Sequence, residues 1–275
     1  MPKPGISAPD EANVDRHFVI AVARAFELLR CWTPAQPLLG VSELARRSGL
    51  PKATVSRLTY TLELLGYLRR DAPSGRYALA WGVASLAYPL LTASTIRQQA
   101  RPQMQELTQR LRVNTNLATL DGLHALYIET VRFDESSKAR PDVGLRYPLL
   151  ASILGRTLLA TMKGAPAQRL RNRLQIAEPT TFAKSWPDVE LARQSLRKQG
   201  YLVAPSELHP GFLMVAAPLL SAAEGEPMAM NCSIPLGQYS TSEVRQTVGP
   251  LVLEAARAID VRMQSMAGGA RSAQP

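Results

Sequence analysis

The chain has 275 residues, 46% of them hydrophobic, and its 32 Lys and Arg against 22 Asp and Glu give a formal net charge of +10. This length suits two domains, and the positive charge favours a polyanionic partner. No run of about 18 apolar residues is present to span a bilayer, and the lone cysteines Cys31 and Cys232 predict buried reduced thiols rather than a disulfide framework or a metal site.

Residues 1–13 are rich in Pro and small polar side chains and lack the apolar stretch of a signal peptide. We therefore expect a disordered start and a cytoplasmic protein. The first helix is predicted to begin near Arg16, where apolar residues recur at helical spacing. The residues expected on its buried face are Phe18, Val22, Ala25, Phe26 and Leu29.

The stretch from Val41 to Leu58 predicts two short helices joined by a tight turn. Gly49 stands where the first helix must stop, because Gly enters left-handed backbone geometry without a Cβ penalty. Pro51 suits the first turn of the second helix. Apolar residues at helical spacing are expected to face inward from the two helices: Leu44, Ala45, Val55, Leu58, Leu62 and Leu65.

The outer face of the second helix carries small, hydroxyl-bearing and basic side chains, which is typical of a recognition helix that approaches bases and phosphates. The residues predicted to contact DNA from this helix-turn-helix are Ser42, Lys52, Ala53, Thr54, Ser56, Arg57 and Tyr60. Two short strands flank the turn at residues 72–75, which predicts a hairpin. Such a hairpin after a recognition helix indicates a wing, and its cations Arg69, Arg70 and Arg76 are expected against phosphates.

Seven Lys and Arg oppose three acidic residues between Val41 and Ala80, a local net charge of +4. This local excess lies where DNA should bind, and it supports a winged helix-turn-helix over residues 14–80. The weakly charged helical pattern at residues 81–95 then predicts a linker helix that also packs against another surface, such as a second subunit.

The rest of the chain predicts an α+β domain over residues 96–268 with an antiparallel sheet, followed by a disordered tail at 269–275. Its first helix carries Ile96, Ala100, Met104, Leu107 and Leu111, and a hairpin is expected around Asp121-Gly122. A polar loop and a short strand at 144–149 follow. Further helices are predicted at 152–162, 165–174 and 188–199, strands at 212–220 and 227–236, and a closing helix at 242–266 with Val248, Val252, Ala255, Ala256 and Ile259 inward.

The order and spacing of several motifs resemble the isocitrate lyase regulator (IclR) family of bacterial transcription factors. The amino-terminal part carries E-L-A-x-x-x-G-L-P-K-x-T-V-x-R-L at 43–58 and G-Y-L at 66–68. The second part carries G-L-R-Y-P-L at 144–149, L-G-R-T-L-L-A at 154–160, L-R-K-Q-G-Y at 196–201 and A-A-P-L at 216–219. The resemblance covers about residues 14–266.

This resemblance implies a ligand-responsive regulator of a catabolic operon whose second domain is GAF-like, with a small-molecule pocket between one face of the sheet and the surrounding loops and helices. By family position the effector-binding residues would be Asn116, Thr119, Leu150, Ala151, Ser152, Leu154, Gly155, Met214, Asn231 and Ser233. Relatives usually carry an acidic cluster after the G-Y pair, whereas this chain reads L-V-A-P-S-E-L-H-P-G and keeps only Glu207. The departure favours a larger or less polar effector, such as an aromatic compound, beside the organic acids of the family.

Two other classes stay open beside the regulator. An enzyme would use His17, His124 or His209 as a base with Asp121, Glu129 or Asp134 as partner, although no nucleophile elbow, H-E-x-x-H motif, phosphate loop or paired-cysteine spacing is present. A ligand-binding module would use its winged helix for protein contacts only.

We predict the regulator, which binds double-stranded operator DNA and a small organic acid or aromatic effector, without catalytic residues, cofactor, metal or membrane contact. Two recognition helices are needed to read a symmetric operator, so a homodimer is the minimum unit. The family resemblance suggests a tetramer made from two such dimers.

Overall fold

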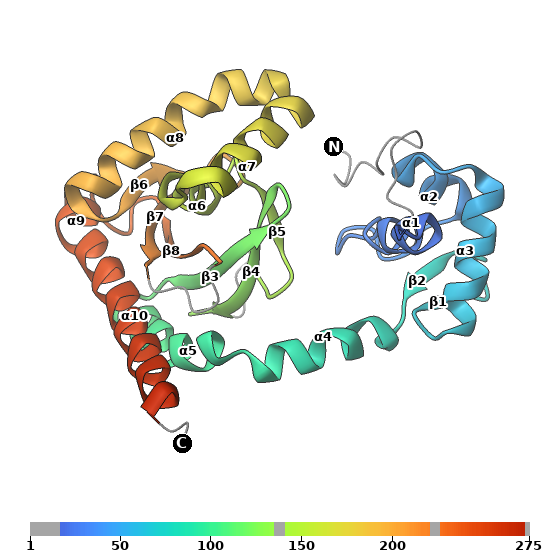
Figure 1. Ribbon diagram of the computed structural model, residues 1–275, viewed down its shortest axis with the longest axis horizontal. Helices are drawn as coiled ribbons and strands as arrows, with labels where there is room; N and C mark the ends of the chain where they lie inside the picture. Colours follow the sequence, from blue (N-terminus) through green and yellow to red (C-terminus); the bar gives the residue numbers. More distant parts are fainter. Residues whose placement is uncertain (1–16, 135–140, 221–225, 273–275) are drawn as a thin grey trace. The chain divides into compact units, whose positions relative to one another are not determined.

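The computed structural model describes residues 17–134, 141–220 and 226–272, and the chain forms two compact units, residues 1–93 and 94–275. The predicted disordered segment 1–13 lies outside the described residues. No helix in the described ranges is both long enough and apolar enough to cross a membrane. The predicted α+β fold with an amino-terminal winged helix-turn-helix is confirmed (Figure 1).

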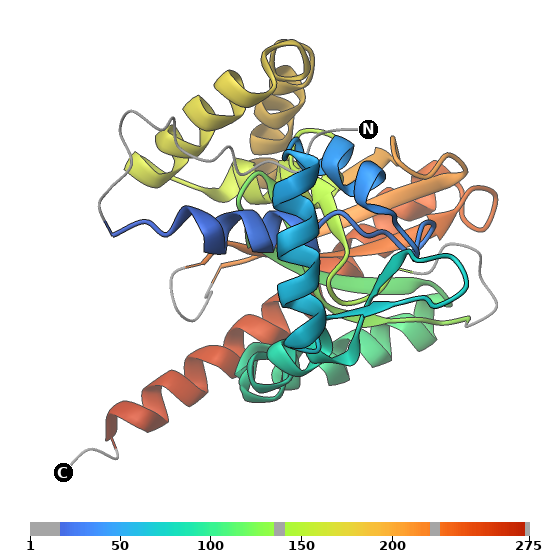
Figure 2. The same cartoon turned by 90° about the vertical axis from the view of Figure 1, so that its right-hand side faces the viewer.

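The first unit consists of three helices, a two-stranded antiparallel hairpin and a further helix (Figures 1 and 2). Its elements are α1 (Ile20–Leu29), α2 (Val41–Ser48), α3 (Lys52–Leu64), β1 (Leu68–Arg70), β2 (Tyr77–Leu79) and α4 (Trp81–Ala93). Gly49 ends α2 with a φ of 73°, as its position predicted. The core between the helices and the hairpin is small and includes Leu28, Leu44, Val55 and Leu68.

The buried face of α1 differs from the prediction. Phe18, Val22 and Phe26 have exposed fractions of 38%, 53% and 55%, while Leu28 is fully buried. The cause is that α1 packs into the core through the side that carries Leu28, which is roughly opposite the side of Val22 and Phe26 on the helix, while Phe18 precedes the helix. Leu65, also predicted to face inward, is exposed because α3 ends at Leu64 and the stripe stops there.

The second unit is built on one antiparallel sheet of six strands in the order β5-β4-β3-β8-β7-β6. The strands are β3 (Asn114–Asp121), β4 (His124–Val131), β5 (Arg146–Pro148), β6 (Leu202–Pro205), β7 (Phe212–Leu219) and β8 (Met228–Pro235). The helical elements are α5 (Thr95–Leu111), α6 (Ile153–Thr161), α7 (Gly164–Ala177), α8 (Pro179–Gln199), α9 (Thr241–Glu243), a π-helical segment (Val244–Val248) and α10 (Gly249–Ser272).

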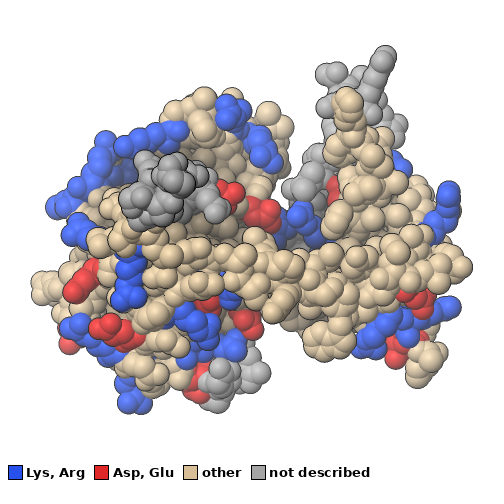
Figure 3. All heavy atoms as spheres, turned by 60° about the horizontal axis from the view of Figure 1, so that its bottom comes forward, with Lys and Arg blue, Asp and Glu red and all other residues tan. Residues whose placement is uncertain are grey.

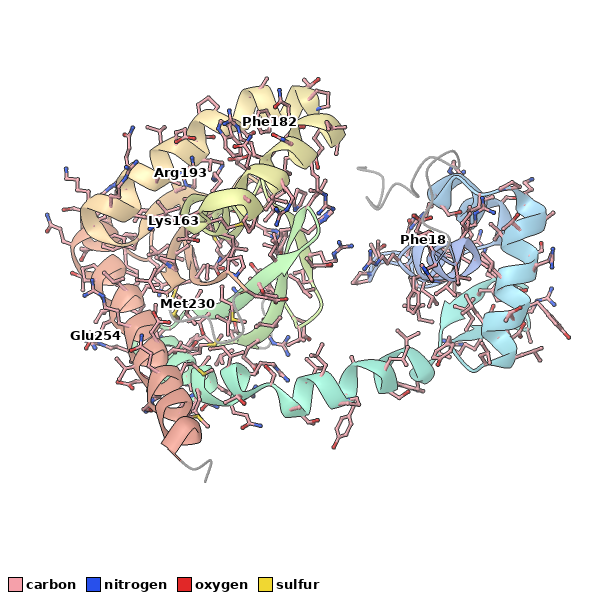
Figure 4. The ribbon with its side chains drawn as sticks, viewed as in Figure 1. Phe18, Lys163, Phe182, Arg193, Met230 and Glu254 are labelled. Atoms are coloured by element: carbon pink, nitrogen blue, oxygen red, sulfur yellow. The ribbon has the colours of Figure 1, made fainter. Side chains whose placement is uncertain are left out.

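Helices cover both faces of this sheet and make two separate cores. On one face α5 and α10 pack against side chains such as Met230, which is labelled in Figure 4, and all predicted inward residues of both helices are buried. On the other face α6 packs on the sheet and α8 packs on α6, where Phe182 is buried. The second core lies next to the ligand cavity described below.

Several boundaries differ from the prediction. The segment 202–211, for which no strand was predicted, begins with the strand β6. The helix α8 begins at Pro179, nine residues before the predicted start, and keeps Pro187 inside it because Phe182, Ser185 and Val189 are buried on both sides of that proline. The last helix continues to Ser272, so residues 269–272 of the predicted tail are helical and only 273–275 lie outside the described residues.

Candidate DNA interface and ligand cavity

The helix α3 separates a buried face from a polar exposed one. Val55, Thr59 and Leu62 are buried, and the Thr59 hydroxyl donates to the Val55 carbonyl at 3.0 Å, so it needs no other partner. The opposite face exposes Lys52, Ala53, Ser56, Arg57 and Tyr60. Thr54 is half-buried beside them, and Ser42 is exposed on α2. The exposed side chains on α3 are one or two helical turns apart, which is the spacing of a surface that enters a groove.

An acidic cap fixes the start of α2 next to the wing. The Gly40 backbone N–H donates to the Glu43 carboxylate at 3.0 Å, and this hydrogen bond holds the pKa of Glu43 below its ordinary value. Arg76 lies 3.8 Å from the same carboxylate. Arg47 donates to the Cys31 carbonyl at 2.7 Å and therefore supports the fold rather than the exposed face.

The wing is a tight hairpin with cations on its strands. The Asp71 carboxylate accepts hydrogen bonds from the hydroxyl and the backbone N–H of Ser74, which hold the pKa of Asp71 below its ordinary value and close the turn. Arg69 and Arg70 are exposed on β1, and the Arg70 guanidinium lies over the Tyr77 ring at 5.9 Å. The wing cations thus lie on a rigid hairpin, as phosphate contacts require.

A cavity with about 350 Å³ of space free of protein atoms, part of it open to solvent, lies in the second unit between α6, the sheet and the loop after β6. Its walls come from β4, β5, β7, β8, the start of α6 and residues 205–209. Its lining residues are Tyr127, Tyr147, Ala151, Ser152, Ile153, Leu154, Arg156, Pro205, Ser206, Glu207, Leu208, His209, Met214 and Asn231.

The loop at residues 205–209 is tied to the cavity wall by two pairs of side chains. Arg156, of which 6% is exposed, forms an ion pair with Glu207 of this loop and lies 3.6 Å from Asp188 of α8. The Tyr147 hydroxyl lies 2.8 Å from His209 Nε2, and their rings meet edge-on at 5.7 Å between centroids. The Glu207 carboxylate therefore pairs with the buried Arg156 guanidinium at the cavity.

Two tyrosine rings form the aromatic part of the wall. Tyr127 and Tyr147 meet edge-on with their centroids 5.2 Å apart. Burial raises the pKa of both hydroxyls above the ordinary value, so both are neutral donors at physiological pH. Ser152 caps α6 by accepting from the Gly155 backbone N–H at 3.1 Å, which directs the amino-terminal end of this helix at the cavity, where negative charge is favoured.

Asn231 carries a buried amide at the cavity. Its side chain is 1% exposed and lines the cavity. The Oδ1 atom accepts from Asn116 Nδ2 at 2.9 Å, whereas Asn231 Nδ2 makes no hydrogen bond of good geometry in the described part of the chain. The Asn231 side chain does lie close enough to the Tyr127 hydroxyl to oppose the rise that burial gives the Tyr127 pKa, so the two side chains are polar neighbours and the pairing between them is weak.

The structure brings half of the residues proposed by family position together at this cavity. Ala151, Ser152, Leu154, Met214 and Asn231 line it, whereas the following do not: Asn116, Thr119, Leu150, Gly155 and Ser233. Gly155 instead allows close packing, because a Cβ there would lie 2.2 Å from the Leu149 carbonyl oxygen. Asn116 lies behind Asn231 and is fully buried. Thr119 is 3.3 Å from Glu226 Oε2, at the other end of β3.

No ligand role was predicted for Tyr127, Tyr147 or Arg156 from the sequence. The signal available for Arg156 was its place in the L-G-R-T motif, one residue after a glycine already proposed for the pocket. Tyr147 likewise stands in the G-L-R-Y-P-L motif. No comparable signal marked Tyr127, because its strand pairs with β3 only in the folded chain.

The residues considered for catalysis are engaged in other contacts. Arg146 lies 2.8 Å from Asp121 and 3.3 Å from His124 Nδ1, at the end of the β3–β4 hairpin. Glu129 is paired with arginines of α5, and His209 is paired with Tyr147. These contacts give the enzyme alternative no support.

Two family models match the chain over most of its length. The model described as the IclR helix-turn-helix domain matches residues 21–72, and the model described as the bacterial transcriptional regulator IclR C-terminal domain matches residues 89–261. The Pca regulon regulatory protein of Pseudomonas putida is 28% identical over 245 residues, which cover 88% of this chain and 84% of that protein.

Solved structures agree with these matches. The crystal structure of an IclR family transcriptional regulator from Brucella abortus superposes with a TM-score of 0.82 at 34% identity, covering 93% of this chain and 96% of that one. An IclR homologue from Microbacterium hydrocarbonoxydans, solved in complex with 4-hydroxybenzoate, superposes with a TM-score of 0.67 at 25% identity, covering 89% of this chain and 99% of that one.

Proposed function

Because the chain belongs to the IclR family of bacterial transcriptional regulators, we propose that α3 and the wing bind a specific operator. As a member of this family the protein is a ligand-responsive DNA-binding regulator and not an enzyme. The observation that carries the residue assignment is the exposed face of α3, where Lys52, Ser56, Arg57 and Tyr60 lie opposite a fully packed face. The remaining proposed DNA contacts are Ser42, Ala53, Thr54, Arg69, Arg70 and Arg76.

The test is selection of an operator from a random duplex library, followed by measurement of its affinity against a scrambled duplex at several salt concentrations. We expect a preference for the selected sequence and an affinity that falls steeply with salt, because cations of the protein replace counterions on phosphates. Equal affinity for both duplexes would favour the alternative in which the winged helix contacts proteins only.

We propose that the cavity of the second unit binds an aromatic acid as the effector. The Tyr127 and Tyr147 rings suit an aromatic ring, and Arg156 and the start of α6 suit a carboxylate. The weakly paired Asn231 Nδ2 donor suits an acceptor at the same site. The 4-hydroxybenzoate bound to the Microbacterium homologue supports this class.

A thermal-shift comparison tests the ligand class. Ligands that bind only the folded state raise the midpoint temperature by mass action. We expect benzoate and 4-hydroxybenzoate to raise it, 4-hydroxybenzamide to raise it less, and Asn231→Leu to abolish the shift. A shift with pyruvate but with neither aromatic acid would replace the aromatic class by short oxo-acids.

We also propose that α4 and the outer face of α1 form a dimer with a second copy of the chain. The helix α4 has no charged side chain and buries none of its residues, and its surface is a tan band in Figure 3. Trp81, Tyr88 and Leu90 are 89%, 67% and 72% exposed. An apolar surface of this extent marks an interaction site, and a symmetric operator needs two recognition helices.

Sedimentation velocity tests the dimer. Leu90→Arg should shift the protein toward the monomer and weaken operator binding, whereas Leu191→Arg, at an exposed leucine on α8, should change neither. A tetramer built from two such dimers is the larger assembly that we expect at higher concentration. Since operator DNA lies in the bacterial cytoplasm, we propose that the protein acts there.

A further inference from the structure

A chain of buried polar side chains leads away from the cavity through the sheet. Asn116 and Asn231 are register partners on β3 and β8, with exposed fractions of 0% and 1%. Asn116 Nδ2 donates to Asn231 Oδ1 at 2.9 Å, and the Thr130 hydroxyl on β4 donates to Asn116 Oδ1 at 3.2 Å. Each amide therefore has its oxygen engaged, and the orientation of one fixes that of the next.

A β-bulge carries this chain to the other face of the sheet. The pairing of β3 with β4 slips by one residue, so Leu117 pairs with Glu129 while Ala118 pairs with Tyr127. In a regular strand, residues two apart share a face. Because Ile128 is the extra residue, Tyr127 lines the cavity while Glu129 faces α5.

Glu129 ties the sheet to the first turns of α5. Its side chain is 3% exposed and its Oε1 atom accepts from the Thr130 backbone N–H at 3.1 Å. Arg101 lies 2.8 Å from Oε1 and Arg97 lies 2.9 Å from Oε2. A buried carboxylate requires such partners, so the position of Glu129 fixes the position of the first turns of α5. In the sequence, α5 directly follows α4, which links it to the DNA-binding unit.

We propose that this polar chain, from Asn231 through Asn116 and Thr130 to Glu129, transmits occupancy of the cavity to α5. The proposal rests on the function proposed above, in that the effector accepts a hydrogen bond from Asn231 Nδ2 in place of its weak contact with the Tyr127 hydroxyl. Glu129 and Thr130 are positioning residues that touch neither effector nor DNA. If the Asn231 amide turns, the buried Asn116 amide loses its hydrogen-bond partner. Asn116 and Thr130 therefore reorient with Asn231 and shift Glu129 together with its ion pairs to α5. An effector changes operator affinity only through such a difference between two arrangements.

Thr130→Val tests the middle of the chain, because it removes the hydroxyl at nearly constant shape. The matched control is Thr161→Val on α6, an equally half-buried threonine whose hydroxyl bonds only within its own helix. The probe is 4-hydroxybenzoate, with its affinity measured by calorimetry and the operator affinity measured with and without it. We expect Thr130→Val to bind the probe within about threefold of wild type, while the ratio of operator affinities with and without probe falls to about one. If the operator affinities of Thr130→Val with and without probe differ by the same ratio as in wild type, the proposal is overturned.

Hydrogen exchange without ligand tests the chain independently of the effector's identity. We expect Asn231→Ala, Thr130→Val and Glu129→Gln each to speed exchange of the backbone amides at residues 99–101, 103 and 104 in α5 several-fold, and Thr161→Val to leave them unchanged. Unchanged exchange in Asn231→Ala would refute transmission from the cavity. If wild type does not bind the probe, the proposed ligand class fails, while the exchange experiment still decides the proposal about the chain.

Discussion

Arg57→Ala on α3 and Arg69→Ala on the wing each remove one positive charge from the DNA-binding unit and can be compared directly. Both arginines are exposed, so Ala at either position leaves the core intact. A lost bidentate base contact costs about 1–3 kcal/mol, and a dimer makes the contact twice, so Arg57→Ala should weaken operator binding by about 2–6 kcal/mol. A lost phosphate contact lowers the salt slope of the affinity by about 0.9, so Arg69→Ala should lower it by about 1.8 per dimer.

Fluorescence anisotropy with the selected operator and a scrambled duplex, repeated over a range of salt concentrations, measures both quantities. Arg57→Ala should bring the operator affinity toward that of the scrambled duplex. Arg69→Ala should weaken both duplexes equally, and Arg197→Ala, an exposed arginine on α8, is the control. The assignment is refuted if Arg57→Ala weakens both duplexes alike, or if Arg69→Ala leaves the salt slope unchanged.

Three further predictions follow from the second unit and the core. Glu207→Gln should tighten 4-hydroxybenzoate binding about two- to fivefold in calorimetry by freeing Arg156, a modest gain because Glu207 is 48% exposed, and an equal gain for 4-hydroxybenzamide would contradict it. Gly155→Ala should lower stability by about 1–3 kcal/mol in urea unfolding, because its Cβ overlaps Leu149, whereas helix propensity alone predicts a gain. Burial raises the pKa of Cys31 to about 11, so a thiol reagent at neutral pH should label it only on unfolding; rapid labelling of the native protein would disprove this.

The sequence was sufficient to predict those features that depend on one local property of the chain. Gly49 ends α2 in the left-handed conformation, and the residues predicted to face inward from α5, the π-helical segment and α10 are all buried. These features depend on local backbone geometry and helical periodicity, which the sequence carries directly.

The sequence was insufficient where the outcome depends on what packs against an element. The stripe on α1 has the spacing of a buried face, yet Val22 and Phe26 are exposed because the opposite side of α1, which carries Leu28, meets the core. The cavity is a stronger example, since Tyr127 and Glu129 have the same parity along β4 and are separated only by the bulge at Ile128. The sequence of β4 alone does not predict the extra residue. Which residues line the cavity and which contact α5 therefore depends on how β4 pairs with β3.

The central claim is that occupancy of the cavity changes how the chain binds DNA. The most direct measurement is the affinity of the intact protein for its selected operator with and without saturating 4-hydroxybenzoate, after binding of that acid has been established by thermal shift. The account predicts a change of about fivefold or more, in the range typical of coupled sites. Demonstrated binding of the acid with an unchanged operator affinity would contradict it.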